Sequence, residues 1–323
     1  MDGRLITALI VVIGVPAVLF GYIVVTERLI RLAPDRYQDR LRPWVWLFPA
    51  IAFLTVFLVY PTVYTIYLSF LDKFTKNFIG LDNYIYFFTT SDTLTALRNN
   101  AIWLLLLTLF AVGGGLLIAI LVDRVRYESV AKSIIFVPLA ISFVGAGVIW
   151  KFMFDYRPPG QPQTGTLNGI LGSVGQDPVP WLLNSPLNTV MLIVVAAWIW
   201  TGFCMVILSG ALKGISTELL EAARVDGANE WQVFRGITFP LLLPTIAVVA
   251  TTMVITSLKA FDIVYVMTNG AFDTEVIANR MYKELFAFGQ PGRASATAVL
   301  LLLLIIPVMA VNIRRFRAQE AMR

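Results

Sequence analysis

Two ionisable residues, Lys259 and Asp262, interrupt an apolar run over residues 241–265. If the run is one helix, a spacing of three places both side chains on the same face and within reach of each other. An ionisable group inside a membrane costs a few kcal/mol even on insertion scales, so such residues are functional candidates by default. They could border a translocation cavity or act as the charge switch of an ion-coupled transporter. The alternative is a local ion pair near the outer end of the helix.

Aromatic and hydroxyl side chains in this apolar run and in the one before it have the chemistry of a path for a sugar. Trp198, Trp200 and Phe203 lie in one apolar run, and Thr256 and Ser257 lie in the next. Sugars are held by hydrogen bonds and by rings that cover their C–H faces, so both kinds of side chain are needed near the membrane midplane. Aromatic residues in a helix are more often ordinary packing groups, which is the alternative interpretation.

The residue types that the sequence lacks exclude most enzymatic chemistry. There is no histidine, which removes the usual general base, the commonest metal ligand and the histidine-activated nucleophiles. The single cysteine, Cys204, cannot form an intrachain disulfide or a cysteine-rich zinc site. No G-x-x-x-x-G-K-[ST] sequence forms a phosphate cradle, so any ATP must be bound by another chain. We therefore expect no catalytic residue and no metal site, and the net charge of +5 is too small to indicate nucleic acid.

The elements that position the candidate residues are expected to be membrane-spanning helices. Hydrophobic residues make up 58% of the 323 residues and charged residues 14%, against about 45–50% and about 25% in soluble domains. A spanning helix needs about 20 apolar residues, because the hydrocarbon core of the lipid bilayer is about 30 Å thick. Seven stretches are long enough, which predicts an all-α, polytopic transmembrane helix bundle: residues 5–25, 44–69, 100–122, 133–152, 187–211, 241–265 and 294–313.

The distribution of Lys and Arg between alternate connections predicts the orientation of the bundle. Fifteen of the 25 Lys and Arg residues lie in connections 27–43, 123–132 and 212–240 and in the C-terminal tail, and eight lie in the opposite set. The first set is therefore expected to face the cytoplasm, with the N-terminus outside and the C-terminus inside. Connection 155–180, rich in proline and glycine, is then an ordered outer loop without a helix.

The longest cytoplasmic connection, residues 212–240, has the signals of two short helices. A first helix is expected over residues 218–226, and Gly227 can adopt the left-handed conformation that ends it. Asn229 can cap a second helix, with Gln232 completing a capping box. Helices this short are marginal alone in water, so we expect their apolar groups to pack on the inner end of the bundle and on a partner protein.

Several residues of this connection fall at the offsets of the EAA loop in permease subunits of ABC importers that depend on a binding protein. They are Glu221, Ala222, Ala223, Gly227, Ile237 and Pro240. The text EAARVDGANEWQVFRGITFPLLLP resembles the sugar-importing branch related to the maltose permease, and the likeness extends from about residue 44 to about residue 313. The segments LVDRVRYESVAKSIIFVPLAISFVGAGVIWKF and YRPPGQPQ are more narrowly similar to permeases of α-glucoside importers, including relatives that take up glucosylglycerol.

This resemblance implies a type I ABC importer permease of a bacterial inner membrane, with a permease domain at residues 44–323 and an extra helix and basic loop at residues 1–43. It also implies a second homologous permease, an ATPase dimer that binds ATP and Mg, and an extracytoplasmic solute-binding protein. The implied solute is an α-glucoside or a similar osmolyte, such as trehalose, maltose, sucrose or glucosylglycerol. An ion-coupled secondary transporter that uses Lys259 and Asp262 is the alternative from a different class.

In the family that this chain resembles, the first loop helix sits in a groove of an ATPase subunit and transmits nucleotide-driven closure to the transmembrane helices. The resemblance implies that Glu221 makes a charge-assisted contact to an arginine of that subunit, and that Ala222 and Ala223 let the helix seat closely. Gly227 then sets the angle between the two helices. Asp226 either joins this contact or solvates the helix end.

Maltose-type permeases contact their solute from the two helices that flank this connection. Aligned on the EAA glutamate, the corresponding positions are Trp200, Phe203, Met253, Thr256, Ser257 and Ala260. Several of these positions are polar in the maltose permease and apolar in this chain, which implies a different or sparser site. Together with Trp198, Lys259 and Asp262, they form the candidate solute path.

Overall fold

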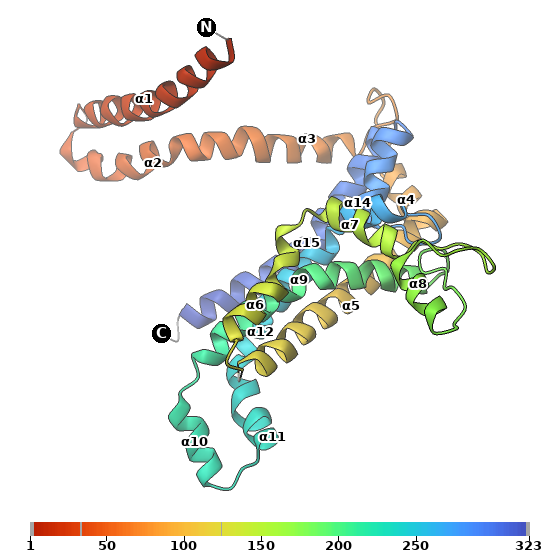
Figure 1. Cartoon of the computed structure of the whole chain (residues 1–323). Coiled ribbons are helices and arrows are strands. Elements are labelled where there is room, and N and C mark those ends of the chain that lie inside the picture. The colour runs from red at the N-terminus through yellow and green to blue at the C-terminus, as the bar shows by residue number, and fades with distance from the viewer. Residues whose placement is uncertain (1–2, 33, 124, 321–323) are drawn as a thin grey trace. The chain divides into compact units, whose positions relative to one another are not determined.

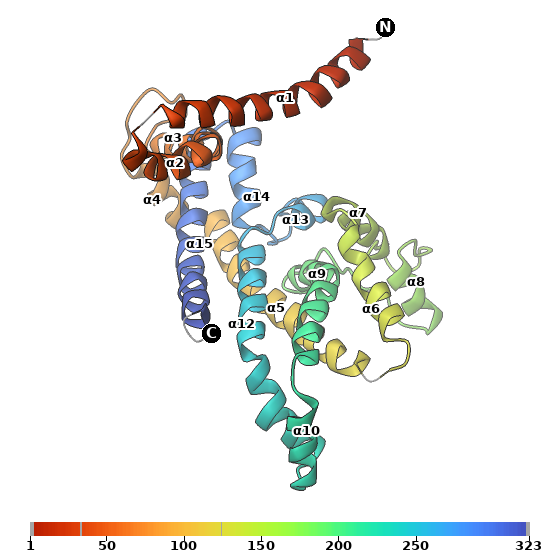
Figure 2. The ribbon, with the colours of Figure 1, turned by 90° about the vertical axis from the view of Figure 1, so that its left-hand side faces the viewer.

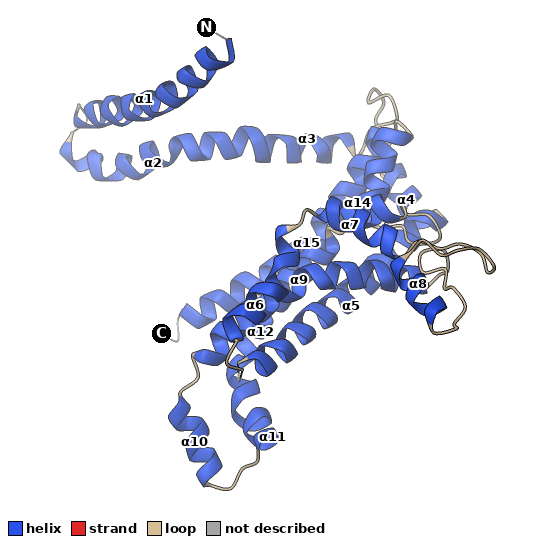
Figure 3. Cartoon of the chain, in the orientation of Figure 1, coloured by secondary structure: helices blue, strands red, loops and turns tan. Residues whose placement is uncertain are grey.

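A computed structural model describes residues 3–32, 34–123 and 125–320, and nearly all of its regular structure is helical (Figure 3). Within these ranges, the extended pairing is limited to one isolated antiparallel bridge between Leu71 and Phe78. The prediction of an all-α fold is therefore confirmed. The helices group into two compact units, residues 1–64 and 65–323.

The first unit is a helical hairpin built from α1 (Gly3–Arg31), α2 (Asp35–Leu54), the π-helical turn η1 (Thr55–Val59) and the start of α3 (Tyr60–Leu68). Arg42 of α2 forms an ion pair with Glu27 of α1 at 3.1 Å, which links the two helices. Because α2, η1 and α3 form one uninterrupted span, the boundary expected after residue 43 lies inside a helix.

The second unit contains a bundle of long helices and a set of shorter ones, of which α6 lies alongside α9 (Figures 1 and 2). The long helices are α5 (Ser91–Val122), α9 (Leu187–Lys213), α12 (Phe239–Leu258) and α15 (Pro291–Glu320). The shorter elements are α4 (Asp82–Thr89), α6 (Glu128–Phe136), η2 (Val137–Ala140), α7 (Phe143–Met153), α8 (Thr166–Ser173), α10 (Thr217–Val225), α11 (Glu230–Val233), η3 (Phe234–Thr238), α13 (Asp262–Met267), α14 (Ile277–Tyr282) and η4 (Lys283–Ala287).

Six helices in the described ranges are long and apolar enough to cross a membrane, and a seventh span results if a bent pair counts as one. This pair, α6 with η2 followed by α7, bends by 98° and replaces the single helix expected over residues 133–152. Pro138 removes a backbone donor just before the bend. Ser142 then starts a new helix, because its hydroxyl oxygen accepts a bond from the Gly145 amide at 3.0 Å.

The helix expected over residues 241–265 is also interrupted, and this prediction was wrong. α12 ends at Leu258, and a new helix, α13, begins at Asp262. The buried side chain of Asn100 from α5 stabilises this break, since its amide nitrogen donates to the Leu258 carbonyl at 3.2 Å and its oxygen accepts from the Ile277 amide at 2.8 Å. The same side chain therefore joins the end of α12 to the start of α14.

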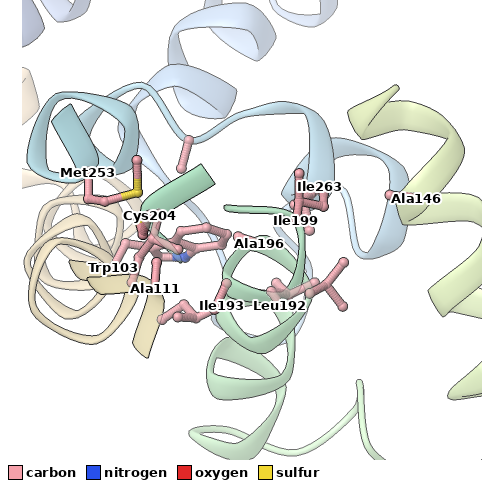
Figure 4. Close-up of a cluster of buried hydrophobic side chains, with 14 of the residues drawn as sticks. Trp103, Ala111, Ala146, Leu192, Ile193, Ala196, Ile199, Cys204, Met253 and Ile263 are labelled. Carbon is pink, nitrogen blue, oxygen red and sulfur yellow. The ribbon is translucent and has the colours of Figure 1, made fainter. Parts of the chain in front are cut away.

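α9 is the most buried spanning helix, and it packs along α5 in the centre of the second unit. Figure 4 shows how Trp103 of α5, Cys204 of α9 and Met253 of α12 meet in the apolar core. Gly115 permits the close approach of α5 to α9, because a Cβ at this position would lie 2.6 Å from the Cβ of Cys204. The core therefore fixes the relative positions of the helices that carry the candidate solute residues.

The connection over residues 155–180 is ordered, but it contains the short helix α8, which its proline and glycine content did not predict. Asn168 of α8 is fully buried and organises the loop. Its amide nitrogen donates to the carbonyls of Asp155 at 2.9 Å and Val179 at 3.0 Å, and its oxygen accepts from the indole of Trp181 at 3.1 Å. These bonds tie α8 to the beginning and the end of the connection.

Candidate coupling and solute sites

The longest predicted cytoplasmic connection folds into two short helices, α10 and α11, which project from one end of the bundle (Figure 1). Ser216 precedes α10, but its side chain makes no capping bond. α10 ends at Val225, and Gly227, two residues later, has the expected left-handed conformation with a φ of 87°. The Gly227 amide donates to the Arg224 carbonyl at 3.1 Å. The Ala228 amide donates to the Ala223 carbonyl at 3.0 Å, which completes a Schellman cap.

α11 begins with the predicted capping box. The Asn229 side chain accepts from the Gln232 amide at 2.9 Å, and the Gln232 side chain accepts from the Asn229 amide at 2.8 Å. α11 continues through the π-helical η3 into α12, so one helical run extends over Glu230–Leu258. Ile237 lies in η3, and Pro240 lies in the first turn of α12. We refer to α10, α11 and the Gly227 turn as the elbow.

An ion pair spans the elbow. Arg224 Nε lies 2.8 Å from Glu230 Oε1, and the hydrogen bond with this carboxylate raises the pKa of the Arg224 guanidinium. Both side chains are about half exposed, and pairs of this kind contribute roughly 0–1 kcal/mol. The ion pair therefore supports the angle that the Gly227 cap sets, without being the main determinant of that angle.

Most of the residues that the sequence assigns to the EAA loop lie on the surface of the protein. Those exposed are Glu221, Ala222, Asp226, Gly227 and Pro240, and those half-buried are Ala223 and Ile237. Glu221 makes no hydrogen bond or ion pair with any residue that the structure describes, and its charge only attracts the Arg224 guanidinium, which is paired with Glu230. Two apolar side chains of the elbow are also strongly exposed, Val225 at 87% and Trp231 at 66%. This combination of an unpaired carboxylate and exposed apolar groups is typical of a surface that another protein covers.

The packing of the elbow on the inner end of the bundle is only partial. Val233 of α11 is buried. A groove of ≈ 590 Å³, lined by Leu117 and Leu121 of α5 and by Leu220 and Trp231 of the elbow, separates the remaining apolar groups from the bundle. The elbow is thus anchored through α11 and η3, whereas α10 projects.

Five of the candidate solute residues line one small cavity at the break between α12 and α13. They are Trp200, Thr256, Lys259, Ala260 and Asp262. Its volume is ≈ 70 Å³, whereas sites for small organic ligands occupy about 300–1,000 Å³. We call it the solute cavity, and in this conformation it has room for water molecules but not for a disaccharide.

The expectation that Lys259 and Asp262 share one helix face was wrong. Lys259 follows the last residue of α12 and Asp262 is the first residue of α13, so they no longer share a helical register. No ion pair or hydrogen bond joins them within the described chain. Lys259 is exposed and Asp262 is half-buried, so each charge borders the cavity separately.

The remaining candidates lie outside the solute cavity. Trp198 packs edge-on against a tryptophan of α7, with the ring centroids 5.5 Å apart. Phe203 packs edge-on against Trp200, with the centroids 5.6 Å apart. Met253 and Ser257 are fully buried, Met253 within the apolar core. The alternative interpretation of ordinary packing therefore describes these four residues in this conformation.

A buried ionic network, which the sequence did not predict, lies at the other end of the unit from the elbow. Arg280 was counted only as an outer positive charge, but its side chain is 7% exposed and that of Glu284 is 1% exposed. The Arg280 guanidinium lies 2.8 Å from Glu284 and 3.0 Å from Asp92, and it donates to the Tyr86 hydroxyl at 2.7 Å. The spacing of four between Arg280 and Glu284 was a usable signal for their pair. The network ties α14 to α4 and α5.

Two buried asparagines, also missed, hold the connection that follows α13. The Asn188 amide nitrogen donates to the Phe272 carbonyl at 2.6 Å, and the Asn99 amide nitrogen donates to the Asp273 carbonyl at 2.6 Å. The backbone is left-handed at Asn269, Phe272 and Asp273, with φ values of 49°, 55° and 63°. Such backbone is costly for residues other than glycine, at roughly 1–3 kcal/mol each, and persists where surrounding contacts enforce it.

Comparison with known proteins identifies the family to which this chain belongs. Residues 111–314 match the family model described as "Binding-protein-dependent transport system inner membrane component". The osmoprotective compounds uptake permease protein GgtC of Synechocystis sp. is 56% identical over 279 residues, which are 86% of this chain and all of that protein. The α-glucoside transport system permease protein AglF of Rhizobium meliloti is 46% identical over 280 residues, which are 86% of this chain and 83% of that protein.

A solved structure has the same fold. It is a crystal structure of a bacterial ABC transporter involved in the import of the acidic polysaccharide alginate, and it superposes with a TM-score of 0.76. The match covers 88% of this chain and 99% of the other at 24% identity. This likeness agrees with the expected fold of an ABC importer permease, a multi-pass protein of the inner membrane. The chain belongs to the family of inner membrane components of binding-protein-dependent transport systems.

Proposed function

We propose that this chain is one permease subunit of an ATP-driven importer for a neutral α-glucoside or glucosyl osmolyte. The observation that carries the proposal is the elbow, which presents an unpaired Glu221 and runs through η3 into the helix that borders the solute cavity. The names of the two relatives, an uptake permease for osmoprotective compounds and an α-glucoside permease, support the solute class. The proposed partners are a second permease, an ATPase dimer that binds ATP and Mg, and a solute-binding protein.

The proposed coupling depends on the continuity of α11, η3 and α12. An ATPase subunit that binds α10 through Glu221 displaces the elbow when its nucleotide sites close. Because Thr256 lies near the other end of the same helical run and lines the solute cavity, this displacement moves a cavity wall. The elbow thus biases a bundle with two arrangements, which is the usual form of such switching.

The solute cavity must enlarge before it accepts a disaccharide. At ≈ 70 Å³ it corresponds to a closed arrangement, and the breaks after Ala140 and Leu258 are the places where its walls can separate. Trp200 supplies an aromatic face, and Thr256, Lys259 and Asp262 supply donors and acceptors for sugar hydroxyls. In this proposal, Lys259 and Asp262 bind the solute separately and do not act as a charge switch. The family assignment gives no support to an ion-coupled transporter.

Reconstitution tests the proposal directly. The chain is purified with its second permease and ATPase in liposomes, and uptake of trehalose, maltose, sucrose and glucosylglycerol is measured with the loaded binding protein outside. We expect uptake of at least one of these solutes that depends on ATP inside the liposome and on the binding protein, and that persists without an ion gradient. Uptake by this chain alone, driven by an ion gradient, would overturn the proposal.

A further inference from the structure

A second and larger cavity lies among the connections that face outward in the predicted orientation. Its volume is ≈ 430 Å³, and we call it the outer cavity. Lys151, Asp155 and Tyr156 come from the end of α7 and the loop that follows it, and Tyr265, Asn269 and Phe272 come from α13 and its following connection. This volume lies within the range of about 300–1,000 Å³ for small-molecule sites.

The lining of the outer cavity suits a neutral ligand that is rich in hydroxyl groups. Tyr265 and Phe272 are 39% and 53% exposed, so their rings are available to cover C–H faces. Tyr156 and Asn269 make no side-chain hydrogen bond to any residue that the structure describes, which leaves a hydroxyl and an amide for a ligand. One positive and one negative charge, Lys151 and Asp155, balance each other, which favours a neutral ligand over an ion.

The wall that carries Asn269 and Phe272 is held in place by other helices. Both residues have left-handed backbone, with φ values of 49° and 55°. The buried Asn188 of α9 donates to the Phe272 carbonyl at 2.6 Å. On the facing side, the Lys151 ammonium of α7 donates to the Val266 carbonyl of α13 at 3.4 Å. The cavity is therefore preformed, which lowers the ordering cost of binding a ligand.

The outer cavity adjoins the solute cavity through α13, which packs on α7 (Figure 2). Phe261 and Ile263 line the solute cavity, whereas Tyr265 and Val266 line the outer cavity. The rings of Phe261 and Tyr265 stack with their centroids 5.3 Å apart, so one ring of this pair lines each of the two cavities. A ligand in the outer cavity therefore lies about one helical turn from the solute cavity along α13.

We propose that the outer cavity is a receiving site, which holds one glucosyl unit of the incoming solute while the solute cavity is still closed. The inference rests on the proposed function for the solute class. The volumes support this order of events, since ≈ 430 Å³ accommodates a sugar unit and ≈ 70 Å³ does not. Tyr265 and Phe272 cover the faces of the sugar ring, and Tyr156 and Asn269 bind its hydroxyls.

The experiment measures how fast a maleimide labels cysteines that are introduced at the outer cavity. Cys204 is fully buried, so a cysteine introduced at the cavity is the accessible thiol of this subunit. Val266→Cys and Leu183→Cys place reporters on two walls of the outer cavity, at positions to which the proposal assigns no bond with the sugar. Phe74→Cys is the control, because Phe74 is 71% exposed in another outer connection and does not line the cavity. The assembled complex in nanodiscs is labelled with a maleimide, and the unsubstituted complex gives the background rate.

Labelling is repeated in the presence of each of four solutes: trehalose, maltose, sucrose and glucosylglycerol. Sorbitol at equal concentration is the control, and each measurement is made with and without the binding protein. We expect that, of these solutes, only the transported one slows labelling at both reporters. The effect should saturate, and a solute concentration of roughly ten times its dissociation constant should lower the labelling rate about tenfold. Labelling of Phe74→Cys is expected to be unchanged.

The outcomes separate the two proposals. Protection that requires the binding protein and is independent of sugar means that the cavity receives a protein side chain, and it overturns the receiving site. No protection in any arm, while the unsubstituted complex transports one of the four solutes, overturns the receiving site and leaves the proposed function intact. A complex that transports none of the solutes overturns both.

Discussion

At Glu221, a carboxylate is held on the exposed surface of α10 without an ion pair of its own within the described chain. Reversing this charge should act on the partner and not on the fold. We expect Glu221→Lys to abolish uptake and to weaken binding of the ATPase about thirtyfold or more, because disrupting a buried interfacial charge pair costs roughly 2–5 kcal/mol. Co-purification of the ATPase and liposome uptake measure the two effects.

Glu218 provides the matched control for this substitution. It is an exposed acid on the same helix, one turn earlier, and Glu218→Lys should retain most of the ATPase binding. Equal loss in both variants would mean that the net charge of α10 matters and the position of Glu221 does not. Normal uptake by Glu221→Lys would contradict the coupling role.

Arg280 illustrates a residue whose importance is not visible locally. Its guanidinium bonds the buried carboxylate of Glu284, and Arg280→Met removes that partner. Leaving a buried charge uncompensated costs about 3–5 kcal/mol. We expect a lower Tm for the purified complex, measured by thermal unfolding in detergent. Lys76→Met, an exposed control, should leave Tm unchanged, and equal Tm values for the two variants would rule out a stabilising network.

At the residue scale, the sequence predicted features that depend on neighbouring residues but not contacts between residues far apart in the chain. Gly227, Asn229 and Glu221 were found because cap and motif spacings are local, and the structure places Gly227 and Asn229 in the expected caps. Arg280 was missed because its partners Asp92 and Tyr86 lie 188 and 194 positions away in the sequence. Only the fold brings those side chains together.

At the scale of elements, hydropathy predicted the number of apolar spans but not their continuity. An apolar run is sufficient to predict a span, because length and composition decide whether a segment can cross the hydrocarbon core. It does not predict where a helix stops when a distant side chain replaces the lost helical bonds. Ser142 is a local signal for the first break, whereas the break after Leu258 depends on Asn100 from another helix.

Asn100 can be tested as the residue that stabilises this break. Asn100→Leu leaves the buried carbonyl of Leu258 and the amide of Ile277 without the bonds that Asn100 provides. Each unsatisfied buried group costs about 1–3 kcal/mol, so we expect both Tm and uptake to fall. Asn184→Leu is the control, because Asn184 is exposed. An unchanged Tm for Asn100→Leu would show that the break is stable without this side chain.

At the scale of the whole second unit, one helical run connects the proposed motor contact to the proposed solute site. The elbow lies at the start of Glu230–Leu258, and the solute cavity lies at its end. The energy source and the solute contacts are therefore physically separate in this proposal. A residue at the cavity should affect solute affinity without removing the coupling to ATP.

Lys259 distinguishes the two classes of transporter on this basis. Lys259→Gln keeps a hydrogen-bond donor at the solute cavity but removes the charge, so we expect the KM for uptake to rise about tenfold, which corresponds to about 1.4 kcal/mol. Uptake by this variant should still require ATP and should still be insensitive to collapse of the ion gradients. If Lys259 and Asp262 instead formed a charge switch, Lys259→Gln would abolish accumulation of the solute at every solute concentration. The unsubstituted protein would also lose uptake when the ion gradients collapse. The comparison of both proteins in liposomes, with ATP present and gradients collapsed, therefore decides between a solute contact and an ion-coupling residue.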